Sequence, residues 1–304
     1  MSKHVAVLMG GWSAEREVSL VSGAACAEGL RAKGYKVTTI DVGRTISEVL
    51  FKLRPDVVFN ALHGRFGEDG TIQGMLEILG LPYTHSGVLA SALAMHKPTA
   101  LRLFKDAGLA IAEGLLLRRE QVLSGHLPPR PYVIKPINEG SSVGVRIVLE
   151  QDNFAPADDM SWPYGDTVLV ERYIPGREIQ VAVMGERGLG AVEIRPKGRF
   201  YDYEAKYTEG RAEHLMPAPL AAEDYAEALR IALTAHRTLG CRGVSRTDLR
   251  FDDTKRGPGK FYVLEVNTQP GMTPLSLVPE IARHQGIEFP ELVAWMVEDA
   301  SCER

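Results

Sequence analysis

Two stretches near the C-terminal end decide the fold: Val244-Ser-Arg-Thr-Asp-Leu-Arg-Phe251 and Phe261-Tyr-Val-Leu-Glu-Val-Asn267. In both, apolar and polar residues alternate, which is typical of β-strands, and residues two apart on a strand share one face. The segment 252–260 between them is rich in turn residues, so the pattern predicts a hairpin. The hairpin would bring Asp248, Glu265 and Asn267 side by side, with Arg246 next to them.

This group of oxygen donors predicts a magnesium site. Neighbouring carboxylates repel one another unless positive charge lies between them, and an all-oxygen set suits Mg²⁺, which commonly bridges to phosphate. An arginine beside such a site indicates phosphoryl chemistry, in which the metal and the guanidinium neutralise developing charge. The alternative is a solvated hairpin whose charges face water.

Composition narrows the class of protein. The 304 residues, 45% hydrophobic and 24% charged, suffice for about two globular domains. The net charge of −4, without a basic run, argues against a nucleic-acid partner. The three cysteines lack metal or redox spacing and favour a reduced compartment. Because no apolar run could span a bilayer or serve as a signal segment, we expect a cytoplasmic protein without a membrane partner.

The first third of the chain has the alternating strand and helix pattern of an α/β sheet. Strands are expected at residues 5–9, 36–42 and 56–62. Helices are expected at 17–33, with Val18, Val21, Ala25 and Leu30 facing inward, and at 46–53. This order predicts a small parallel, Rossmann-like sheet with a ligand site at the carboxyl ends of its strands.

The rest of the chain has an α+β pattern. A long helix is expected at 88–107, and it is followed by short strands at 132–135, 143–149, 167–173, 178–184 and 191–195. Further helices are expected at 222–239, 275–285 and 289–299. The sequence thus predicts an N-terminal α/β lobe followed by two α+β lobes.

Two loops have features of anion sites. Met9-Gly-Gly-Trp-Ser-Ala-Glu15 follows a strand and opens a helix, with Ser13 as the natural N-cap. Lys135 ends a strand ahead of Gly140-Ser-Ser-Val-Gly144, whose N–H and hydroxyl groups could bind phosphate. The second loop also fits the nucleophile elbow of hydrolases, but that motif requires a helix after it, where this sequence predicts a strand.

Several longer motifs occur in an informative order: Gly10-Gly-Trp-Ser-Ala-Glu-Arg-Glu-Val-Ser19, Ala61-Leu-His-Gly-Arg-Phe-Gly-Glu-Asp-Gly70, Gly140-Ser-Ser-Val-Gly144, Tyr201-Asp-Tyr-Glu-Ala-Lys-Tyr207, Arg246-Thr-Asp248 and Glu265-Val-Asn-Thr-Gln-Pro-Gly-Met-Thr273. Together they resemble the D-alanine–D-alanine ligases of the ATP-grasp superfamily, nearly end to end. The resemblance implies an N-terminal substrate-binding lobe at 1–92, followed by a two-lobed ATP-grasp fold with a central lobe at 93–175 and a catalytic lobe at 176–304.

The resemblance also implies an activity. The expected reaction joins two D-alanines through a D-alanyl phosphate, with release of ADP and phosphate, for peptidoglycan precursor synthesis. ATP is the co-substrate, two Mg²⁺ ions assist (Mn²⁺ can substitute), and family members are commonly homodimers. The alternatives are an ATP-grasp ligase with another acceptor, such as D-lactate or another D-amino acid, and an ATP-binding protein without turnover.

The resemblance assigns the following residues to ATP: Lys97 and Lys135 on the phosphates, Glu171, Arg172, Tyr173 and Ile174 as the hinge that reads adenine, Glu178 on the ribose, and Ser142, Phe200 and Lys206. Asp248, Glu265 and Asn267 bind the metal ions. Glu15 pairs with the ammonium of the first D-alanine, and His63 orients that substrate or moves a proton. Arg246 and the N–H of Gly271 stabilise the oxyanion, and Ser276 and the N–H of Leu277 bind the second carboxylate. Lys206 contacts the transferring phosphoryl group and the second substrate.

By the same resemblance, Glu15, Ser141 and Tyr207 form a hydrogen-bonded set that holds a loop at 201–216 over the site. A tyrosine at 207 favours the dipeptide over the ester product. Five residues depart from the family pattern: Asn138, His96 and Pro98 on either side of Lys97, Arg250 at a usually apolar position near adenine, and Gln269.

Overall fold

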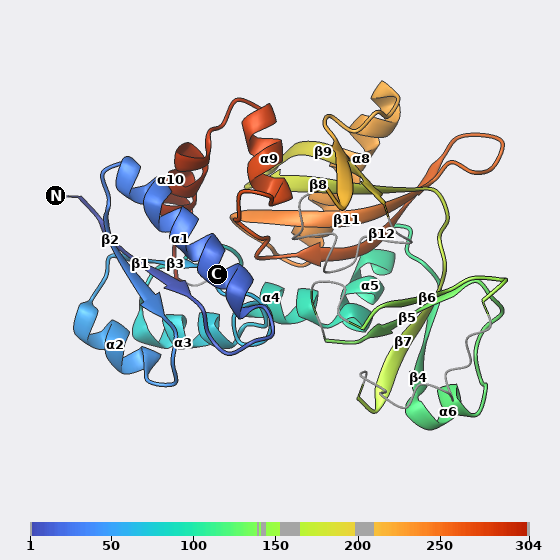
Figure 1. Cartoon of the computed structure of the whole chain (residues 1–304), viewed down its shortest axis with the longest axis horizontal. Helices are drawn as coiled ribbons and strands as arrows, with labels where there is room; N and C mark the ends of the chain where they lie inside the picture. The colour runs from blue at the N-terminus through green and yellow to red at the C-terminus, as the bar shows by residue number, and fades with distance from the viewer. Residues whose placement is uncertain (1, 139, 141–143, 153–164, 198–209, 303–304) are drawn as a thin grey trace.

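The computed structural model describes residues 2–138, 140, 144–152, 165–197 and 210–302. Three separate sheets follow one another along the chain (Figure 1). Ser141, Ser142, Phe200, Lys206 and Tyr207, to which the sequence assigns site roles, lie outside the described residues. Across the described residues, no helix combines the length and apolar character needed to cross a membrane.

The first sheet is parallel, as predicted. It consists of β1 (His4–Met9), β2 (Lys36–Asp41) and β3 (Val57–Asn60) in the order β2-β1-β3. The helices α1 (Arg16–Ala32) and α2 (Ile46–Leu53) connect its strands, and α3 (Thr71–Leu79) follows β3. Residues 5–8 of the central strand are fully buried, because helices cover both faces of such a sheet. The helix α3 was not anticipated from the sequence.

The inner face of α1 differs from the prediction. Val18 and Leu30 are buried as expected, but Val21 is 51% exposed. The face against β1 carries small residues instead, among them Ser22 and Gly23. A Cβ on Gly23 would lie 2.4 Å from the Cβ of Met9, so close packing on the strand selects small side chains over the apolar ones.

The predicted single helix at 88–107 is two helices. Here α4 (Val88–Met95) ends and α5 (Lys97–Asp106) begins at His96, whose φ and ψ of −90° and 87° are not helical. Pro98 lies in the first turn of α5, where its missing N–H costs no hydrogen bond. The Nδ1 of His96 accepts from the N–H of Thr99 at 3.3 Å. The break therefore directs Lys97 inward from the start of a new helix.

The second sheet is antiparallel, in the order β4-β7-β5-β6. Its strands are β4 (Gly114–Arg118), β5 (Tyr132–Pro136), β6 (Arg146–Val148) and β7 (Thr167–Arg172), and the short helix α6 (Arg119–Leu123) follows β4. The strand β6 is shorter than the predicted 143–149. Because a strand follows Gly144, the strand–turn–helix arrangement of a nucleophile elbow is not present in the described residues.

The third sheet has the order β10-β9-β8-β11-β12. Its strands are β8 (Arg177–Met184), β9 (Arg187–Pro196), β10 (Ala212–Leu215), β11 (Val244–Asp252) and β12 (Lys260–Asn267), with α8 (Ala222–Thr238), α9 (Leu277–His284) and α10 (Phe289–Asp299). The strand β10 pairs with β9, so part of the predicted 201–216 loop is a sheet edge instead.

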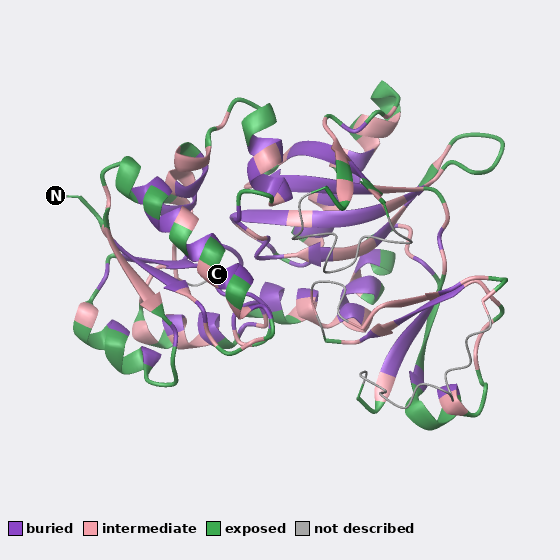
Figure 2. Ribbon diagram, in the orientation of Figure 1, coloured by how far each residue is buried: buried purple, intermediate pink, exposed green. Residues whose placement is uncertain are grey.

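The first and third sheets share a core. Helix α10 packs against α1 (Figure 1), and one cluster of buried residues extends from Val7 and Phe59 to Val192 and Met296. Buried residues face this core from β1 of the first sheet, from β9 of the third sheet and from one side of α1, whose other side is exposed (Figure 2). This shared core includes Ala61, directly after β3, and Met272, in the segment that follows β12, so it holds the two segments together.

Candidate functional site

The predicted hairpin is present. In the antiparallel pair β11–β12, Arg246 lies opposite Asn267 and Asp248 opposite Glu265. The guanidinium of Arg246 donates to both carboxylate oxygens of Asp248, at 2.7 and 3.0 Å. The four residues therefore form one polar cluster, as the spacing predicts.

A β-bulge makes this cluster possible. Leu249 pairs with Val263, so Leu264 has no partner across β11–β12. Under strict alternation, Glu265 would share a face with Phe261 and Val263, which are buried in the core. The extra residue moves Glu265 and Asn267 to the opposite face. The sequence analysis missed this bulge because it assumed strict alternation.

A larger cavity of about 410 Å³ lies between the second and third sheets. It is lined by many of the residues assigned to ATP or metal: Lys97, Lys135, Glu171, Arg172, Tyr173, Ile174, Glu178, Asp248 and Glu265. Apolar side chains, including Val133 and Ile147, line it as well. A cavity of this size with both apolar walls and a charged end suits a nucleotide.

The two lysines of the larger cavity pair with carboxylates. Lys135 lies 2.5 Å from Glu171, and Lys97 lies 3.5 Å from Glu265. Burial by itself lowers the pKa of Lys135, but the carboxylates of Glu171, Glu265 and Glu178 outweigh it and raise the pKa above its ordinary value. Lys135 is therefore held as an ammonium, the form that binds a phosphate.

A smaller cavity of about 60 Å³ adjoins the first. It is lined by Glu15, His63, Arg246, Asn267 and Gly271, which the sequence assigns to substrates or metal, together with Glu68. Lys97 and Glu265 line both cavities. The two spaces thus meet where the cluster of charges lies.

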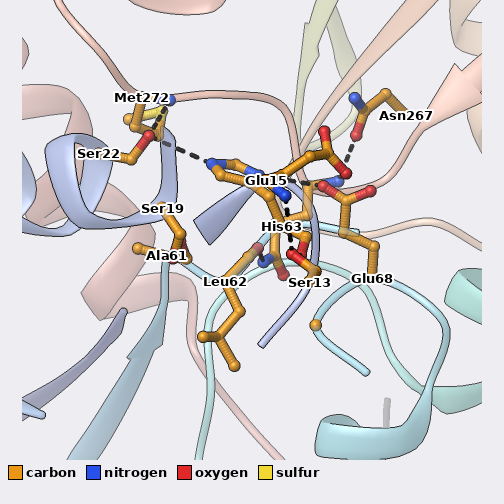
Figure 3. A network of polar contacts seen from close by, with 12 residues as sticks. Ser13, Glu15, Ser19, Ser22, Ala61, Leu62, His63, Glu68, Asn267 and Met272 are labelled. Atoms are coloured by element: carbon orange, nitrogen blue, oxygen red, sulfur yellow. Dashed lines mark hydrogen bonds and ion pairs between the residues drawn. The ribbon is translucent and has the colours of Figure 1, made fainter. Parts of the chain in front are cut away.

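His63 is held on both sides of its ring (Figure 3). Its Nδ1 lies 3.0 Å from Glu68 and its Nε2 3.2 Å from the hydroxyl of Ser22. Because an ionised Glu68 only accepts, Nδ1 carries the proton and Ser22 donates to Nε2 in the neutral ring. The hydroxyl of Ser22 also accepts from the N–H of Met272 at 3.4 Å. This arrangement fixes the ring at the wall of the smaller cavity.

Glu15 lies at the first turn of α1, 7% exposed. It is the N-cap residue by position, in place of Ser13. The Ser13 hydroxyl instead donates to the carbonyl of His63 at 2.7 Å and accepts from the N–H of Glu15 at 3.2 Å. A side chain at Gly64 (φ +69°) would meet Glu15 at 2.6 Å, so glycine lets the 61–70 loop close over this carboxylate.

The remaining assigned residues lie beside the smaller cavity. Ser276 precedes the first residue of α9, Leu277, as predicted. Its hydroxyl accepts from the N–H of Thr273 at 2.9 Å and would lie 2.8 Å from a Cβ at Gly271. Neither Ser276 nor Leu277 lines either cavity. The segment 271–276 connects them to the smaller cavity, because Gly271 lines that cavity.

Several residues with contacts at the site received no role from the sequence, among them Ser22, Glu68, Gln269 and Asn60. Glu68 stands inside the 61–70 motif, five residues after His63, and that spacing was the available signal. Gln269 is 1% exposed and accepts from the Nδ2 of Asn60 at 2.6 Å, while its own Nε2 donates to the carbonyl of Leu62. Its backbone N–H donates to the Oδ1 of Asn267 at 3.0 Å. No local pattern indicates a contact between residues 209 positions apart.

The donor set is compatible with Mg²⁺. Two carboxylates face one another across the bulged strand pair, and an amide oxygen lies two residues along β12. These are the hard oxygen ligands that Mg²⁺ prefers, in the small number that leaves room for water and phosphate. Within the described residues, no group of three or more His, Cys, Asp or Glu side chains could hold a metal; the candidate set relies on Asn267 as its third member.

Comparison with known proteins agrees with this geometry. The models for the D-ala D-ala ligase N-terminus and C-terminus match residues 44–86 and 103–298. The D-alanine–D-alanine ligase of Parvibaculum lavamentivorans is 61% identical over 305 residues, covering 100% of this chain and 99% of the relative.

Solved structures also match the whole fold. The D-alanine–D-alanine ligase from Bacillus anthracis complexed with ATP has a TM-score of 0.82 at 30% identity, covering 98% of this chain and 97% of that one. The VanG D-Ala:D-Ser ligase from Enterococcus faecalis has a TM-score of 0.80 at 28% identity, covering 98% and 99%. The predicted fold class, a parallel sheet followed by a two-lobed ATP-grasp fold, is confirmed. The two charged cavities meet at Lys97 and Glu265, and the relatives match this chain over its whole length. This chain therefore belongs to the D-alanine–D-alanine ligase family.

Proposed function

We propose that this protein joins two D-alanines to D-alanyl-D-alanine at the expense of ATP, as a step in making peptidoglycan precursors. The observation that carries the proposal is the shared wall of the two cavities at Lys97 and Glu265. A nucleotide in the larger cavity would present its terminal phosphate to a small amino acid in the smaller one. That is the geometry a phosphoryl transfer to a carboxylate requires.

In the larger cavity, the base lies against the hinge at residues 171–174 and the ribose reaches Glu178. Lys135 and Lys97 exchange their present carboxylate partners for the phosphates. Asp248, Glu265 and Asn267 hold Mg²⁺, which would supply charge neutralisation at the phosphates. The guanidinium of Arg246, which here donates to Asp248, would then also contact the reacting centre.

In the smaller cavity, the carboxylate of Glu15 binds the ammonium of the first D-alanine. Glu68 and Ser22 hold the imidazole ring of His63 at the wall of the same cavity.

The substrate carboxylate attacks the γ-phosphorus and ADP leaves, which gives an acyl phosphate. The amine of the second D-alanine attacks this carbonyl carbon, loses a proton and expels phosphate. Arg246 and the N–H of Gly271 stabilise the oxyanion. Ser276 and the N–H of Leu277, at a helix N-terminus, bind the second carboxylate.

We propose three lobes for this reaction, at 1–92, 93–175 and 176–304. We also propose a closing loop within 201–216, which contains Lys206 and is held over the site by Glu15, Ser141 and Tyr207. Ser142 and Phe200 complete the ATP contacts. Closure would keep water from the acyl phosphate, which otherwise hydrolyses.

A second candidate function is ligation to another acceptor. The observation that favours it is the likeness to a structure described as a D-Ala:D-Ser ligase, at a TM-score of 0.80. The acceptor end of the reaction involves few groups, Ser276 and Leu277 among the described residues, so a small change there alters the product. Identifying the products distinguishes the two functions.

We also propose that the protein is a cytoplasmic homodimer. The free thiols of Cys26, Cys241 and Cys302 support a reduced compartment. Phe51 and Ile78, 66% and 88% exposed on neighbouring helices of the first sheet, support an interface there. Analytical ultracentrifugation checks the dimer, and cell fractionation checks the compartment.

The test is to measure ADP release with D-alanine, with L-alanine, and with D-alanine plus D-lactate or D-serine, and to identify the products by mass. One dipeptide per ADP with D-alanine alone is the expected result. Stoichiometric mixed products in preference to the dipeptide would favour the second candidate. ADP binding without turnover on any substrate would contradict both.

Glu265→Gln provides the matching variant. It keeps the shape of the side chain but removes one of the two carboxylates that face each other across β11–β12. We therefore expect a folded protein whose turnover falls by about a hundredfold or more. Near-normal activity at saturating Mg²⁺ would contradict the metal assignment. Glu227→Gln, on the exposed surface of α8, is the control.

A further inference from the structure

Arg250 makes contacts that the ligase reaction does not by itself require. It lies on β11, two residues from Asp248, and lines the larger cavity. Its Nε donates to the carbonyl of Ile174 at 3.1 Å, and its Nη2 donates to the carbonyl of Gly176 at 2.7 Å. Both carbonyls belong to the segment that connects β7 to β8. A single side chain thus ties this connection to the strand that carries Asp248.

The third nitrogen of the guanidinium faces Glu178. Arg250 and Glu178 are cross-strand partners on β11 and β8, and Nη1 lies 3.9 Å from the Oε2 of Glu178. The Oε1 of Glu178 accepts from the Nε2 of Gln180 at 3.0 Å. The carboxylate is therefore oriented from two sides, and one of them is Arg250.

The backbone at Gly176 shows how closely this connection lies on β11. Gly176 has φ +92°, and a Cβ there would stand 2.1 Å from the carbonyl oxygen of Phe251, the residue after Arg250. Only glycine permits this approach. The guanidinium also lies 5.8 Å from the ring centre of Tyr173, a distance at which a cation and an aromatic ring attract. Four residues of the hinge and ribose region, Tyr173, Ile174, Gly176 and Glu178, thus converge on one arginine.

We infer that Arg250 is a positioning residue for the nucleoside half of ATP and that it sets the preference for adenine. The inference rests on the proposed function, since it deepens the assignment of the larger cavity to ATP. With the carbonyls of Ile174 and Gly176 bound to Arg250, the hinge cannot rotate these groups toward the base. The groups that remain turned to the cavity form a fixed pattern, and a fixed pattern discriminates between bases because a mismatched base leaves polar groups unpaired.

Arginine suits this task better than lysine. Its planar guanidinium presents several donors in a rigid fork, so it reaches two carbonyls and a carboxylate at once, whereas the ammonium of lysine is a single point. Ordering the hinge before ATP binds removes an entropic cost from binding. The expected signature is a change in the affinity for ATP and in base selectivity, with D-alanine kinetics preserved.

The experiment compares Arg250→Met and Arg250→Lys with the parent enzyme, and uses Arg230→Met, an exposed arginine of α8, as the control. Steady-state assays give KM and kcat for ATP, for GTP and for D-alanine, and calorimetry gives the Kd of ADP and of inorganic tripolyphosphate, which lacks the nucleoside. Circular dichroism checks that each variant is folded.

We expect Arg250→Met to raise KM for ATP and Kd for ADP about tenfold. The ATP-over-GTP ratio of kcat/KM should fall by a similar factor, while KM for D-alanine and Kd for tripolyphosphate stay within about twofold. Arg250→Lys should resemble Arg250→Met more than the parent. If Arg250→Met does not fold, the lysine variant decides by the same readouts.

Unchanged nucleotide affinity and base selectivity in folded variants would overturn the inference. So would an equal rise in KM for D-alanine, which indicates a general loss of structure, or complete rescue by lysine, which indicates charge alone. A parent protein that binds neither ADP nor tripolyphosphate would overturn the proposed function and this inference with it. If the parent protein binds both ADP and tripolyphosphate, and Arg250→Met has the same nucleotide affinity and base selectivity as the parent, only the inference is overturned.

Discussion

Some buried polar residues in this protein form hydrogen bonds between elements. His236 is an example away from the site: it is 1% exposed in α8, and its Nδ1 lies 2.7 Å from the hydroxyl of Ser245 on β11. Burial lowers the pKa of His236 from 6.5 to about 4, because a charged imidazolium is poorly solvated there. The hydrogen bond of this buried, neutral histidine thus links α8 to β11, the strand that carries the candidate metal ligand Asp248.

His236 predicts how stability depends on pH. Between pH 6.5 and pH 4 the unfolded chain binds a proton at this residue and the folded chain does not, so stability is retained above pH 6.5 and lost as the pH falls. The free energy of unfolding should drop by about 2 kcal/mol from pH 7 to pH 5 on account of His236 alone. Urea unfolding of the parent and of His236→Gln at both pH values measures this.

The variant should have the smaller pH dependence. His284→Gln, at an exposed position near the end of α9, should keep the pH dependence of the parent. The same slope in His236→Gln as in the parent would show that other groups cause the acid sensitivity.

Among the elements, α1 and β1 show how close packing decides which residues face inward. Gly23 lies in the middle of α1, where glycine ordinarily weakens a helix. The helix retains it because the backbone passes directly over Met9 of β1. The same approach brings Ser22 to His63, so the packing of this helix also supports the site.

Gly23→Ala should destabilise the protein by about 1–3 kcal/mol, because the new methyl group overlaps the Cβ of Met9 and neither backbone can yield. Gly74→Ala in α3 is the matched control: the nearest atom to its new Cβ is 4.0 Å away, so it should be neutral or stabilising by up to about 1 kcal/mol. Chemical denaturation of both variants tests the pair. Equal shifts would show that helix propensity, and not packing, governs these positions.

At the scale of the whole molecule, the N-terminal sheet and the end of β12 are joined through Gln269. Its side chain bonds to Asn60 and to the carbonyl of Leu62, while its backbone N–H orients Asn267. This single buried residue connects the loop that carries His63 with a candidate metal ligand. His63 and Asn267, which both line the smaller cavity, therefore keep their relative position through a contact between the first and third sheets.

Gln269→Ala should leave Asn60 and the Leu62 carbonyl without this partner, at a cost of about 1–3 kcal/mol in stability. We expect KM for D-alanine and the Mg²⁺ concentration at half-maximal rate to rise severalfold, with a smaller change in KM for ATP. Steady-state kinetics with each component varied measures this. Gln285→Ala, exposed at the end of α9, is the control; a parallel rise in all three constants would indicate a general loss of structure.

Local patterns predicted much of this architecture. Alternation and turn residues predicted the pairing of β11 with β12, and the strand–helix order predicted the parallel sheet. Most of the described residues to which the family motifs assigned a site role line one of two adjoining cavities. Periodicity fails at Val21, which faces outward because small residues occupy the face of α1 that packs on β1. It also fails at His96, where the predicted 88–107 helix breaks two residues before Pro98.

By itself, then, the sequence determined the identity of the chemical groups, the strands and helices that carry them, and the family. These depend on residue type and on spacings of a few positions, which hold in any surroundings. Only the tertiary structure decided that Leu264 bulges so that Glu265 leaves the core, that Gln269 reaches Asn60, and that Arg250 binds the hinge. Each of these depends on which distant backbone lies within hydrogen-bonding distance, and that is settled by packing the three sheets together.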